Sequence, residues 1–357
     1  MSTLLDIPLI HVRGTPADLG RGQGEQLKPI IAEFVAQRLR AAKVYLFERG
    51  IRDQATFLNL GRQCLDTLKS WDFDGWVEHM ALAEAAGVDA VDLYTTGNMT
   101  DIRDILVLGA MSADAEGCTT ALIPGSQTTT GVVIAAQTWD LNPTDLDFVV
   151  AVYRQPLHGP DTWSVTCAGC PSLMGMNSYG VAVGTTNIKT YGSRIGIPYL
   201  SLLHRAIRCS TRTEALKSII TAPRAGAHTY WSADVAGVDD IECTATTHVF
   251  RAGDQPLIRT NHCQSEAHIA IEGEPATPSS QTRLQRARSW VTSKQDSASL
   301  KALFADRSDG VHSINRRPED AQGTATNACM VAIPAQKILL VCRGPSDRGQ
   351  WIELTFT

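Results

Sequence analysis

Residues 116–121 read EGCTTA, and in this stretch a Gly-Cys peptide bond precedes two threonines. The run CTTALIP at 118–124 is rich in β-branched and apolar residues and predicts a strand that begins at Cys118. Gly117 has no side chain, so its carbonyl group is open and its backbone tolerates a strained conformation. A cysteine at the start of a strand is usually a core residue, but a thiol beside an open carbonyl indicates self-cleavage.

Such a cleavage would create a catalyst out of one residue. Attack of the Cys118 thiol on the Gly117 carbonyl would convert the peptide bond into a thioester, and water would then release a chain that begins at Cys118. The new terminus would carry a sulfur nucleophile and an α-amine, whose ordinary pKa of about 7.7 to 8.0 suits proton transfer near neutral pH. Cys118 would then serve as both nucleophile and base.

The pattern of the sequence changes near residue 117. Before it, apolar residues recur at helical spacing in the stretches 17–50, 53–71, 74–87 and 89–107, with Asp53, Asp74 and Asp89 as predicted N-caps and Gly50 and Gly87 as predicted stops. After it, short β-branched segments alternate with turns such as NSYG at 177–180, and helical spacing returns at 199–221, 279–294 and 297–307. This segregation favours antiparallel sheets layered with helices over a parallel doubly wound sheet.

Composition excludes several classes of protein. The 357 residues are 43% hydrophobic, which is ample for a large core in one α/β unit or two average domains. A net charge of −5 from charges of mixed sign argues against a nucleic-acid surface. We expect a cytoplasmic protein, because no basic leader precedes the short apolar N-terminus and no apolar run approaches the length of a membrane span. Nine cysteines without framework spacing favour reduced thiols.

Three further motifs are weak signals. GRGQG at 20–24 follows no clear strand and lacks the spacing of a phosphate-binding loop, so it predicts close helix packing or a helix start. CAGC at 167–170 has no second pair at finger-like spacing and ends a strand, which argues against a metal or redox site. The basic segment RLQRAR at 283–288 is typical of a solvated helix face, although one of its arginines would be free to point inward.

Four segments in this order carry a resemblance to a known family: EGCTTA, QTWD at 137–140, GMNSYGVAVGTTN at 175–187 and RTNHC at 259–263. Together they resemble the acyl-coenzyme A:6-aminopenicillanic acid acyltransferase family of N-terminal nucleophile hydrolases, and GTPADLGRGQGEQLKPII at 14–31 is similar to its opening segment. The resemblance implies an α+β fold, a four-layer αββα sandwich with two antiparallel sheets. It also implies a helical segment 1–117 and a catalytic segment 118–357, which form one structural unit after cleavage.

The resemblance also implies roles for individual residues. Cys118 matches the nucleophile exposed by cleavage after Gly117, and Asp140 matches an aspartate that orients the new amine. Asn261 matches the asparagine whose amide donates a hydrogen bond to the tetrahedral oxyanion. The purely structural alternatives are that Asp140 caps the turn before Asn142 and that Asn261 ends a strand.

The remaining site residues are less closely matched by the motifs. Arg316 is the best match to an arginine of the later part of the family, with Arg317 and Arg283 as alternatives. Asn177 and Asn187 are expected to make a turn and a pocket-lining hydrogen bond, and Tyr191 is a candidate for the substrate pocket.

The predicted function is hydrolysis of a small linear amide through an acyl-thioester on Cys118, without a cofactor or a metal. An acyltransferase that passes the acyl group to an amine is the first alternative, and an uncleaved, non-catalytic binding homologue is the second. A different specificity, such as that of a bile-salt or N-acyl-homoserine-lactone acylase, is disfavoured because a long helical leader precedes Cys118. The expected partners are the amide substrate and the protein's own two chains as a heterodimer, with further oligomerisation left open and no nucleic acid or membrane.

Overall fold

The computed structural model describes residues 4–107, 117–320 and 322–356, so Glu116 of the opening motif lies outside the described residues. Strand β1 (Leu9–Gly14) comes first and was not predicted. The helices that follow are α1 (Pro16–Glu48), α2 (Gln54–Trp71), α3 (Phe73–Ala86), α4 (Ala90–Gly97) and α5 (Met99–Val107). The predicted succession of helices before residue 117 is therefore confirmed.

The predicted helix ends are confirmed in most cases. The carboxylates of Asp53 and Asp89 accept hydrogen bonds from the first turns of α2 and α4, as N-caps do. Gly87 ends α3 in the left-handed conformation, with φ 72°. The prediction for Asp74 is wrong, because α3 already begins at Phe73 and Asp72 is its N-cap. The Asp72 carboxylate makes no capping hydrogen bond, because it is paired with arginines of α6 and the turn after it.

Two sheets follow from residue 117 onward. An eight-stranded sheet has the order β1-β4-β5-β6-β7-β8-β9-β10, and a six-stranded sheet has the order β11-β2-β3-β12-β13-β14. The strand bounds are β2 (Gly117–Ile123), β3 (Ile134–Leu141), β4 (Val149–Pro156), β5 (Thr162–Cys167), β6 (Met174–Asn177), β7 (Ala182–Asn187), β8 (His228–Asp234), β9 (Gly237–Cys243), β10 (His248–Ala252), β11 (Leu257–Arg259), β12 (Ala325–Ile333), β13 (Ile338–Arg343) and β14 (Ile352–Leu354). Neighbouring strands in the described sheets are antiparallel, as predicted, except that β1 runs parallel to β4.

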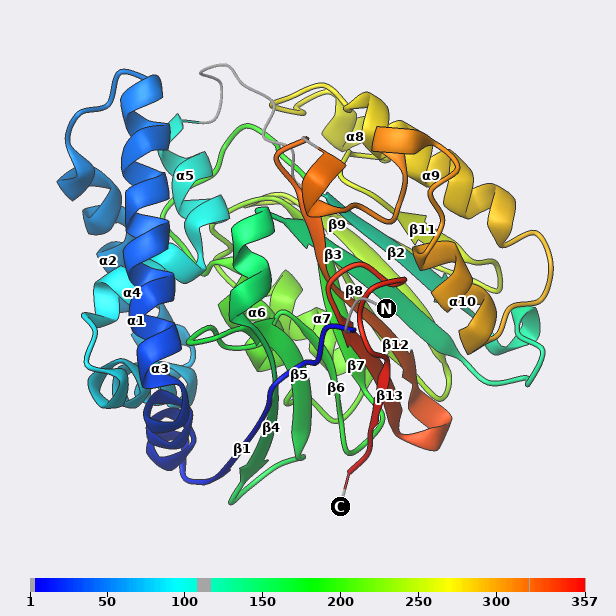
Figure 1. Cartoon of the computed structure of the whole chain (residues 1–357), viewed down its shortest axis with the longest axis horizontal. Coiled ribbons are helices and arrows are strands. Elements are labelled where there is room, and N and C mark those ends of the chain that lie inside the picture. The colour runs from blue at the N-terminus through cyan, green and yellow to red at the C-terminus, as the bar shows by residue number, and fades with distance from the viewer. Residues whose placement is uncertain (1–3, 108–116, 321, 357) are drawn as a thin grey trace.

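The two sheets lie face to face between two layers of helices (Figure 1). The later helices are α6 (Tyr199–Ala206), α7 (Arg212–Ile220), α8 (Glu266–Ile269), α9 (Pro278–Trp290) and α10 (Ser297–Phe304), and short 3₁₀ turns span Gly125–Gln127, Pro143–Phe148, Gly310–His312, Pro318–Asp320 and Pro334–Gln336. Helix α1 packs on β1 and β4 and α7 packs on β8 and β9, whereas α9 packs on β2 and β11 and α10 on β12 and β3. The predicted αββα sandwich is confirmed.

The glycines of GRGQG allow α1 and α3 to pack closely. A Cβ atom on Gly20 would lie 2.0 Å from the carbonyl oxygen of Glu78, and one on Gly24 would lie 2.5 Å from that of Leu82. Real Cβ contacts are longer, so only glycine fits at these two positions. The prediction of close helix packing is confirmed.

The cysteines and the apolar helices carry two simpler findings. All nine cysteines are free thiols, and eight of them are buried. In the part of the chain that the structure describes, no helix is both long and apolar enough to cross a membrane.

Candidate active site

Cys118 is the second residue of β2, in the six-stranded sheet. It lies opposite Trp139 of β3, and only 7% of its surface is exposed. Its backbone N–H donates a hydrogen bond to Oδ1 of Asn261, with 2.7 Å between nitrogen and oxygen. The nitrogen that a cleavage after Gly117 would convert into an amine is therefore already held by a side chain.

Asn261 lies two residues after β11, which pairs with β2. Its Oδ1 accepts a second hydrogen bond, from Nη2 of Arg283 at 2.9 Å, and its Nδ2 donates to the carbonyl oxygen of Asn187 at 3.0 Å. The amide nitrogen, which the resemblance assigns to an oxyanion, is bonded here to the backbone of β7. In this arrangement Asn261 connects the main chain of Cys118 to the other sheet.

Arg283 reaches Cys118 from helix α9. The helix begins with Thr277 as its N-cap and Pro278 at its first position, a common helix start. Arg283 is fully buried, and its Nη1 donates to the carbonyl oxygen of Cys118 and, at 3.0 Å, to Oγ1 of Thr119. The inward-pointing arginine that the basic segment allowed is thus present.

Asp140 and Arg316 both lie next to Gly117, Asp140 on the paired strand β3 and Arg316 in the segment before β12. Asp140 of β3 lies opposite Gly117, and its Oδ2 is 3.8 Å from Nε of Arg316. Arg316 precedes β12 and is fixed there by hydrogen bonds between its backbone and Thr326. A Cβ atom on residue 117 would lie 2.7 Å from Asp140 Oδ2 and 3.0 Å from the Arg316 guanidinium, so the site requires glycine at this position.

The charges of this cluster are incompletely satisfied. Asp140, Arg283 and Arg316 are all buried, and the Nη atoms of Arg316 donate to Thr324 and Ser279, whereas its Nε has no hydrogen-bond partner within the described residues. Burial raises the pKa of the Asp140 carboxyl, and the attraction of Arg316 and Arg283 only partly opposes this. Burial and then the neighbouring Arg316 lower the pKa of Arg283 to about 9. Since a guanidinium stays protonated at neutral pH, this shift reflects the free-energy cost of burying the cation.

A pocket with a cavity of about 30 Å³ opens beside Cys118 between the two sheets. It is lined by Thr100, Cys118, Trp139, Asp140, Leu141, Leu173, Thr185, Asn187, Tyr199, His228 and Asn261. Three of the predicted catalytic residues, Cys118, Asp140 and Asn261, therefore share one pocket, and Arg316 contacts it through Asp140. Segments 143 residues apart in the sequence meet here.

The predicted substrate residues are distributed differently. Asn187 lines the pocket. The Asn177 side chain makes four hydrogen bonds to backbone groups, two of them within the turn that joins β6 to β7, and it does not line the pocket. Tyr191 is 54% exposed and also lies outside the pocket lining. Arg317, the other alternative arginine, is paired with Asp347 near the surface.

Sequence reasoning missed most of the pocket wall. Thr185 and His228 lie on β7 and β8, and Tyr199 begins α6, so only the packing of the sheets brings them to Cys118. For Arg283 a signal existed: Ser280, Arg283, Leu284 and Ala287 are spaced as one helix face, and all four are buried.

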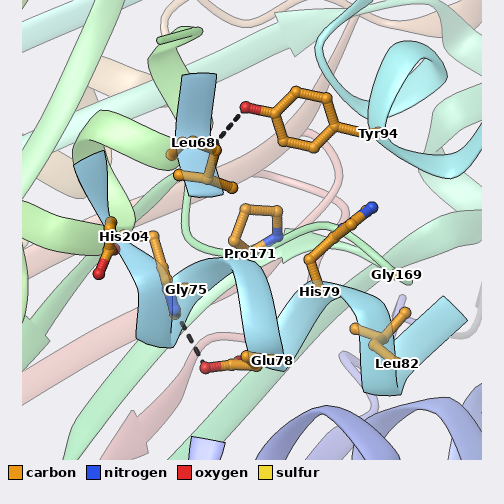
Figure 2. Close-up of a pocket in the computed structure, with 11 residues that line it drawn as sticks. Leu68, Gly75, Glu78, His79, Leu82, Tyr94, Gly169, Pro171 and His204 are labelled. Carbon is orange, nitrogen blue, oxygen red and sulfur yellow. Dashed lines mark hydrogen bonds and ion pairs between the residues drawn. The ribbon is translucent and has the colours of Figure 1, made fainter. Parts of the chain in front are cut away.

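A second cavity, of about 20 Å³, lies among helices α2, α3, α4 and α6, and Cys118 is not among its lining residues (Figure 2). Leu68, Leu82, Tyr94 and Pro171 supply much of its apolar wall, and Glu78 and His204 form a buried hydrogen-bonded pair at its edge. Glu78 also accepts a hydrogen bond from Arg154 at 2.8 Å. In this second cluster, formed by Glu78, His204 and Arg154, every buried polar side-chain atom has a hydrogen-bond partner among the described residues.

Two face-to-face sheets between helical layers, with a buried cysteine at the start of a strand, define the fold of N-terminal nucleophile hydrolases. The model of the acyl-coenzyme A:6-aminopenicillanic acid acyl-transferase family matches residues 127–346. This match spans more than half of the chain, and the chain belongs to that family of N-terminal nucleophile amidases and acyltransferases. No curated protein matches the sequence.

Solved structures with similar chain traces include three amide hydrolases. The Caenorhabditis elegans ortholog of N-acylethanolamine-hydrolyzing acid amidase shares 14% identity, covering 67% of this chain and 100% of its own, with a TM-score of 0.47. Penicillin V acylase from Agrobacterium tumefaciens shares 12% identity, covering 63% and 82%, with a TM-score of 0.42. A mutant of conjugated bile acid hydrolase from Clostridium perfringens shares 11% identity, covering 67% and 92%, with a TM-score of 0.45.

Proposed function

We propose that the protein is a self-processing cysteine amidohydrolase. The Cys118 thiol attacks the Gly117 carbonyl carbon, the backbone nitrogen leaves as the amine of Cys118, and water hydrolyses the resulting thioester. The products are the chains 1–117 and 118–357. The observation that carries this proposal is the hydrogen bond from the Cys118 nitrogen to Asn261 Oδ1, because it anchors the future amine beside Arg283 and Asp140 before any cleavage.

Turnover then uses the same groups on an external amide. The thiol proton passes to the α-amine, the sulfur attacks the amide carbonyl, and the protonated amine donates that proton to the leaving amine. Hydrolysis of the acyl-thioester returns Cys118 to its starting state. Arg283 and Arg316 favour the thiolate and the developing oxyanion by their charge, while Asp140 orients the new ammonium.

The two chains remain together after cleavage as a heterodimer in this proposal. Buried polar pairs across the cleavage point support it: the ion pairs Arg38–Asp145 at 2.7 Å and Glu78–Arg154 at 2.8 Å, and the hydrogen bond between His228 and Asp101 at 2.8 Å. Each would leave an unpaired buried charge if the chains separated. Residues 1–117 and 118–357 therefore act as one structural unit.

The acyl acceptor decides between two activities of the same intermediate. Water gives an amidohydrolase, and a second amine gives an acyltransferase. We favour hydrolysis, because the cavity adjoining Cys118 is small, about 30 Å³, and water is a smaller acyl acceptor than an amine. The third possibility, an uncleaved binding protein, predicts no chemistry at Cys118.

Denaturing electrophoresis separates these readings. Purified protein is expected to give two bands, near one third and two thirds of 38.6 kDa, and Cys118→Ala to give one. The cleaved protein is then incubated with a panel of short acyl amides, with and without an added amine acceptor, while amine release is measured. A single full-length band from the unmutated protein, with no amine release, would refute the proposal. Acyl transfer to the added amine in preference to water would identify the acyltransferase.

A further inference from the structure

His228 lines the pocket beside Cys118 and is paired with Asp101 behind it, and the proposed chemistry does not use this pair. His228 begins β8, lines the same pocket as Cys118 and is 1% exposed. Its Nε2 lies 2.8 Å from Oδ1 of Asp101 on α5. Because Asp101 precedes the cleavage point and His228 follows it, the pair joins the two proposed chains at the pocket wall.

The imidazole of His228 is held in one orientation. Its ring stacks on Tyr199 with 4.7 Å between centroids and an interplanar angle of 21°. Asp101 is fixed in turn, because its Oδ2 accepts a hydrogen bond at 2.7 Å from the backbone N–H of Tyr199. A ring fixed on one face and at one nitrogen presents its other nitrogen in a defined direction.

That other nitrogen, Nδ1, has no hydrogen-bond partner among the residues that the structure describes. A carboxylate can only accept, so the contact with Asp101 places a proton on Nε2 and leaves a lone pair on Nδ1 of the neutral ring. Buried polar atoms in folded proteins are nearly always hydrogen-bonded. An oriented, buried acceptor without a protein partner is therefore a candidate to bind a donor group of a ligand.

The sheet register places this acceptor next to the site of chemistry. His228 lies directly opposite Asn187 on the antiparallel pair β7–β8, so their side chains project from the same face. The carbonyl oxygen of Asn187 accepts the hydrogen bond from Asn261, which in turn accepts from the Cys118 nitrogen. His228 therefore lies on the strand next to Asn187, and Asn187 is linked through Asn261 to the Cys118 nitrogen.

The pocket wall divides by polarity, which indicates which half of an amide meets His228. Trp139, Leu141 and Leu173 form an apolar part suited to an acyl chain, whereas Thr185, Asn187 and His228 form a polar part. A hydrocarbon acyl group has no donor to offer the polar part. The amine half carries at least the N–H of the amide and is the half that can carry a hydroxyl or amino group.

We propose that His228, oriented by Asp101, accepts a hydrogen bond from an O–H or N–H donor on the amine half of the substrate. The preferred substrates are therefore amides of amines that bear a hydroxyl or amino group. This inference rests on the proposed function, since it assigns a specificity to the same pocket. His228 is a substrate-binding residue in this account, and Asp101 is a positioning residue that acts through it.

The test compares amides that differ in one group. N-acyl-3-aminopropanol and N-acyl-propylamine with the same short acyl chain are assayed with cleaved protein, and kcat and KM are measured for each. The hydroxyl amide is expected to be preferred by about tenfold, as for one hydrogen bond to a buried acceptor. His228→Gln keeps an amide group near the Nε2 position but removes Nδ1, so the ratio should fall to about one, mainly through KM.

Two further variants separate binding from folding. His228→Asn places an amide oxygen near the Nδ1 position, so it should retain part of the preference that His228→Gln loses. Asp101→Asn should reduce the preference without abolishing amine release from N-acyl-propylamine. His248→Gln, on the exposed edge strand β10, is the matched control and should leave the ratio unchanged.

The outcomes distinguish this inference from the proposed function. Equal rates on both amides in the unmutated protein, or an unchanged ratio in His228→Gln, would overturn the His228 assignment while self-cleavage and amine release stand. Absence of self-cleavage, or inactivity of the cleaved protein on every amide tested, would overturn the proposed function and this specificity with it.

Discussion

Two buried charge clusters in this protein differ in how well their polar atoms are satisfied. In the helical layer, Glu78 receives hydrogen bonds from Arg154 and His204, and His204 Nδ1 lies 3.1 Å from Ser172 Oγ. None of these four side chains has an unpartnered buried polar atom among the described residues. Burial alone would raise the pKa of Glu78, but His204 and Arg154 outweigh it and hold the pKa below its usual range.

The cluster at Cys118 has the opposite character. Two guanidinium groups, of Arg283 and Arg316, face one carboxylate, of Asp140, and the ion pair that the described residues show there is long, with 3.8 Å between Arg316 Nε and Asp140 Oδ2. Burial raises the pKa of Asp140 and lowers that of Arg283, so both charged forms are costly in the fold. Unsatisfied buried charge destabilises a protein and is tolerated mainly where function requires it. We infer that the Glu78 cluster serves stability and the Cys118 cluster serves chemistry.

The largest effect on cleavage is expected from Arg283→Met. The substitution removes the cation beside Cys118, whose charge favours the attacking thiolate, and is expected to slow self-cleavage by about 10² to 10³. It also removes a destabilising buried charge, so the loss of unfolding free energy should be smaller than for a broken ion pair. Cleavage is followed by electrophoresis after expression, and stability by urea unfolding.

Arg317→Met is the matched control for this substitution. Arg317 is paired with Asp347 near the surface, so its removal should cost less than about 1 kcal/mol and leave cleavage unchanged. If Arg283→Met cleaves as fast as the unmutated chain, the assignment of the Cys118 cluster to chemistry is wrong.

A smaller effect on cleavage is expected from Gly117→Ala. The added Cβ atom would lie 2.7 Å from Asp140 Oδ2, which forces the carboxylate or the scissile carbonyl to shift. Displacements of this size cost roughly 10² in rate when reacting groups are otherwise aligned. The fraction cleaved is measured against time by electrophoresis, with Gly237→Ala as control because its nearest neighbouring atom lies at 3.4 Å. Equal cleavage rates of the two variants would contradict the geometry described for residue 117.

Glu78→Gln should leave cleavage unchanged and reduce stability instead. Breaking a buried ion pair typically costs about 3 to 5 kcal/mol of unfolding free energy, and Arg154 would lose its countercharge. The folded-state pKa of Glu78 is lowered, so its stabilising contribution is present above the unfolded pKa of about 4.3 and is lost as the pH falls below it. Urea unfolding of the variant and the unmutated protein should therefore differ most near pH 7 and converge toward pH 3. A pH-independent difference, or a loss of cleavage, would contradict a purely stabilising role.

The sequence predicted the architecture well because helices and strands are segregated along it. Helical spacing before residue 117 and β-branched runs after it predicted the αββα layers that the structure has. Strand β1 was missed, because its six residues follow Pro8 and its pairing partner β4 lies about 140 positions further along the chain. Such a strand is specified by tertiary pairing rather than by its own pattern.

Only those residues of the candidate site that belong to a recognisable sequence motif could be predicted. Cys118, Asp140 and Asn261 were expected from the motif resemblance, and the structure brings them to one pocket, while their catalytic roles remain proposals. Arg283 was obscured by a basic helix segment, although its spacing from Ala287 places it on the buried face. His228 and Asp101 are 127 positions apart, and no local pattern connects them.

The most direct test of the central claim is N-terminal sequencing of the larger fragment of the freshly purified protein. Cleavage after Gly117 predicts a terminus that reads Cys-Thr-Thr-Ala-Leu-Ile, from Cys118 onward, and no such terminus in Cys118→Ala. A protein whose only terminus is that of the full-length chain, or a fragment that begins at another residue and persists in Cys118→Ala, would contradict it.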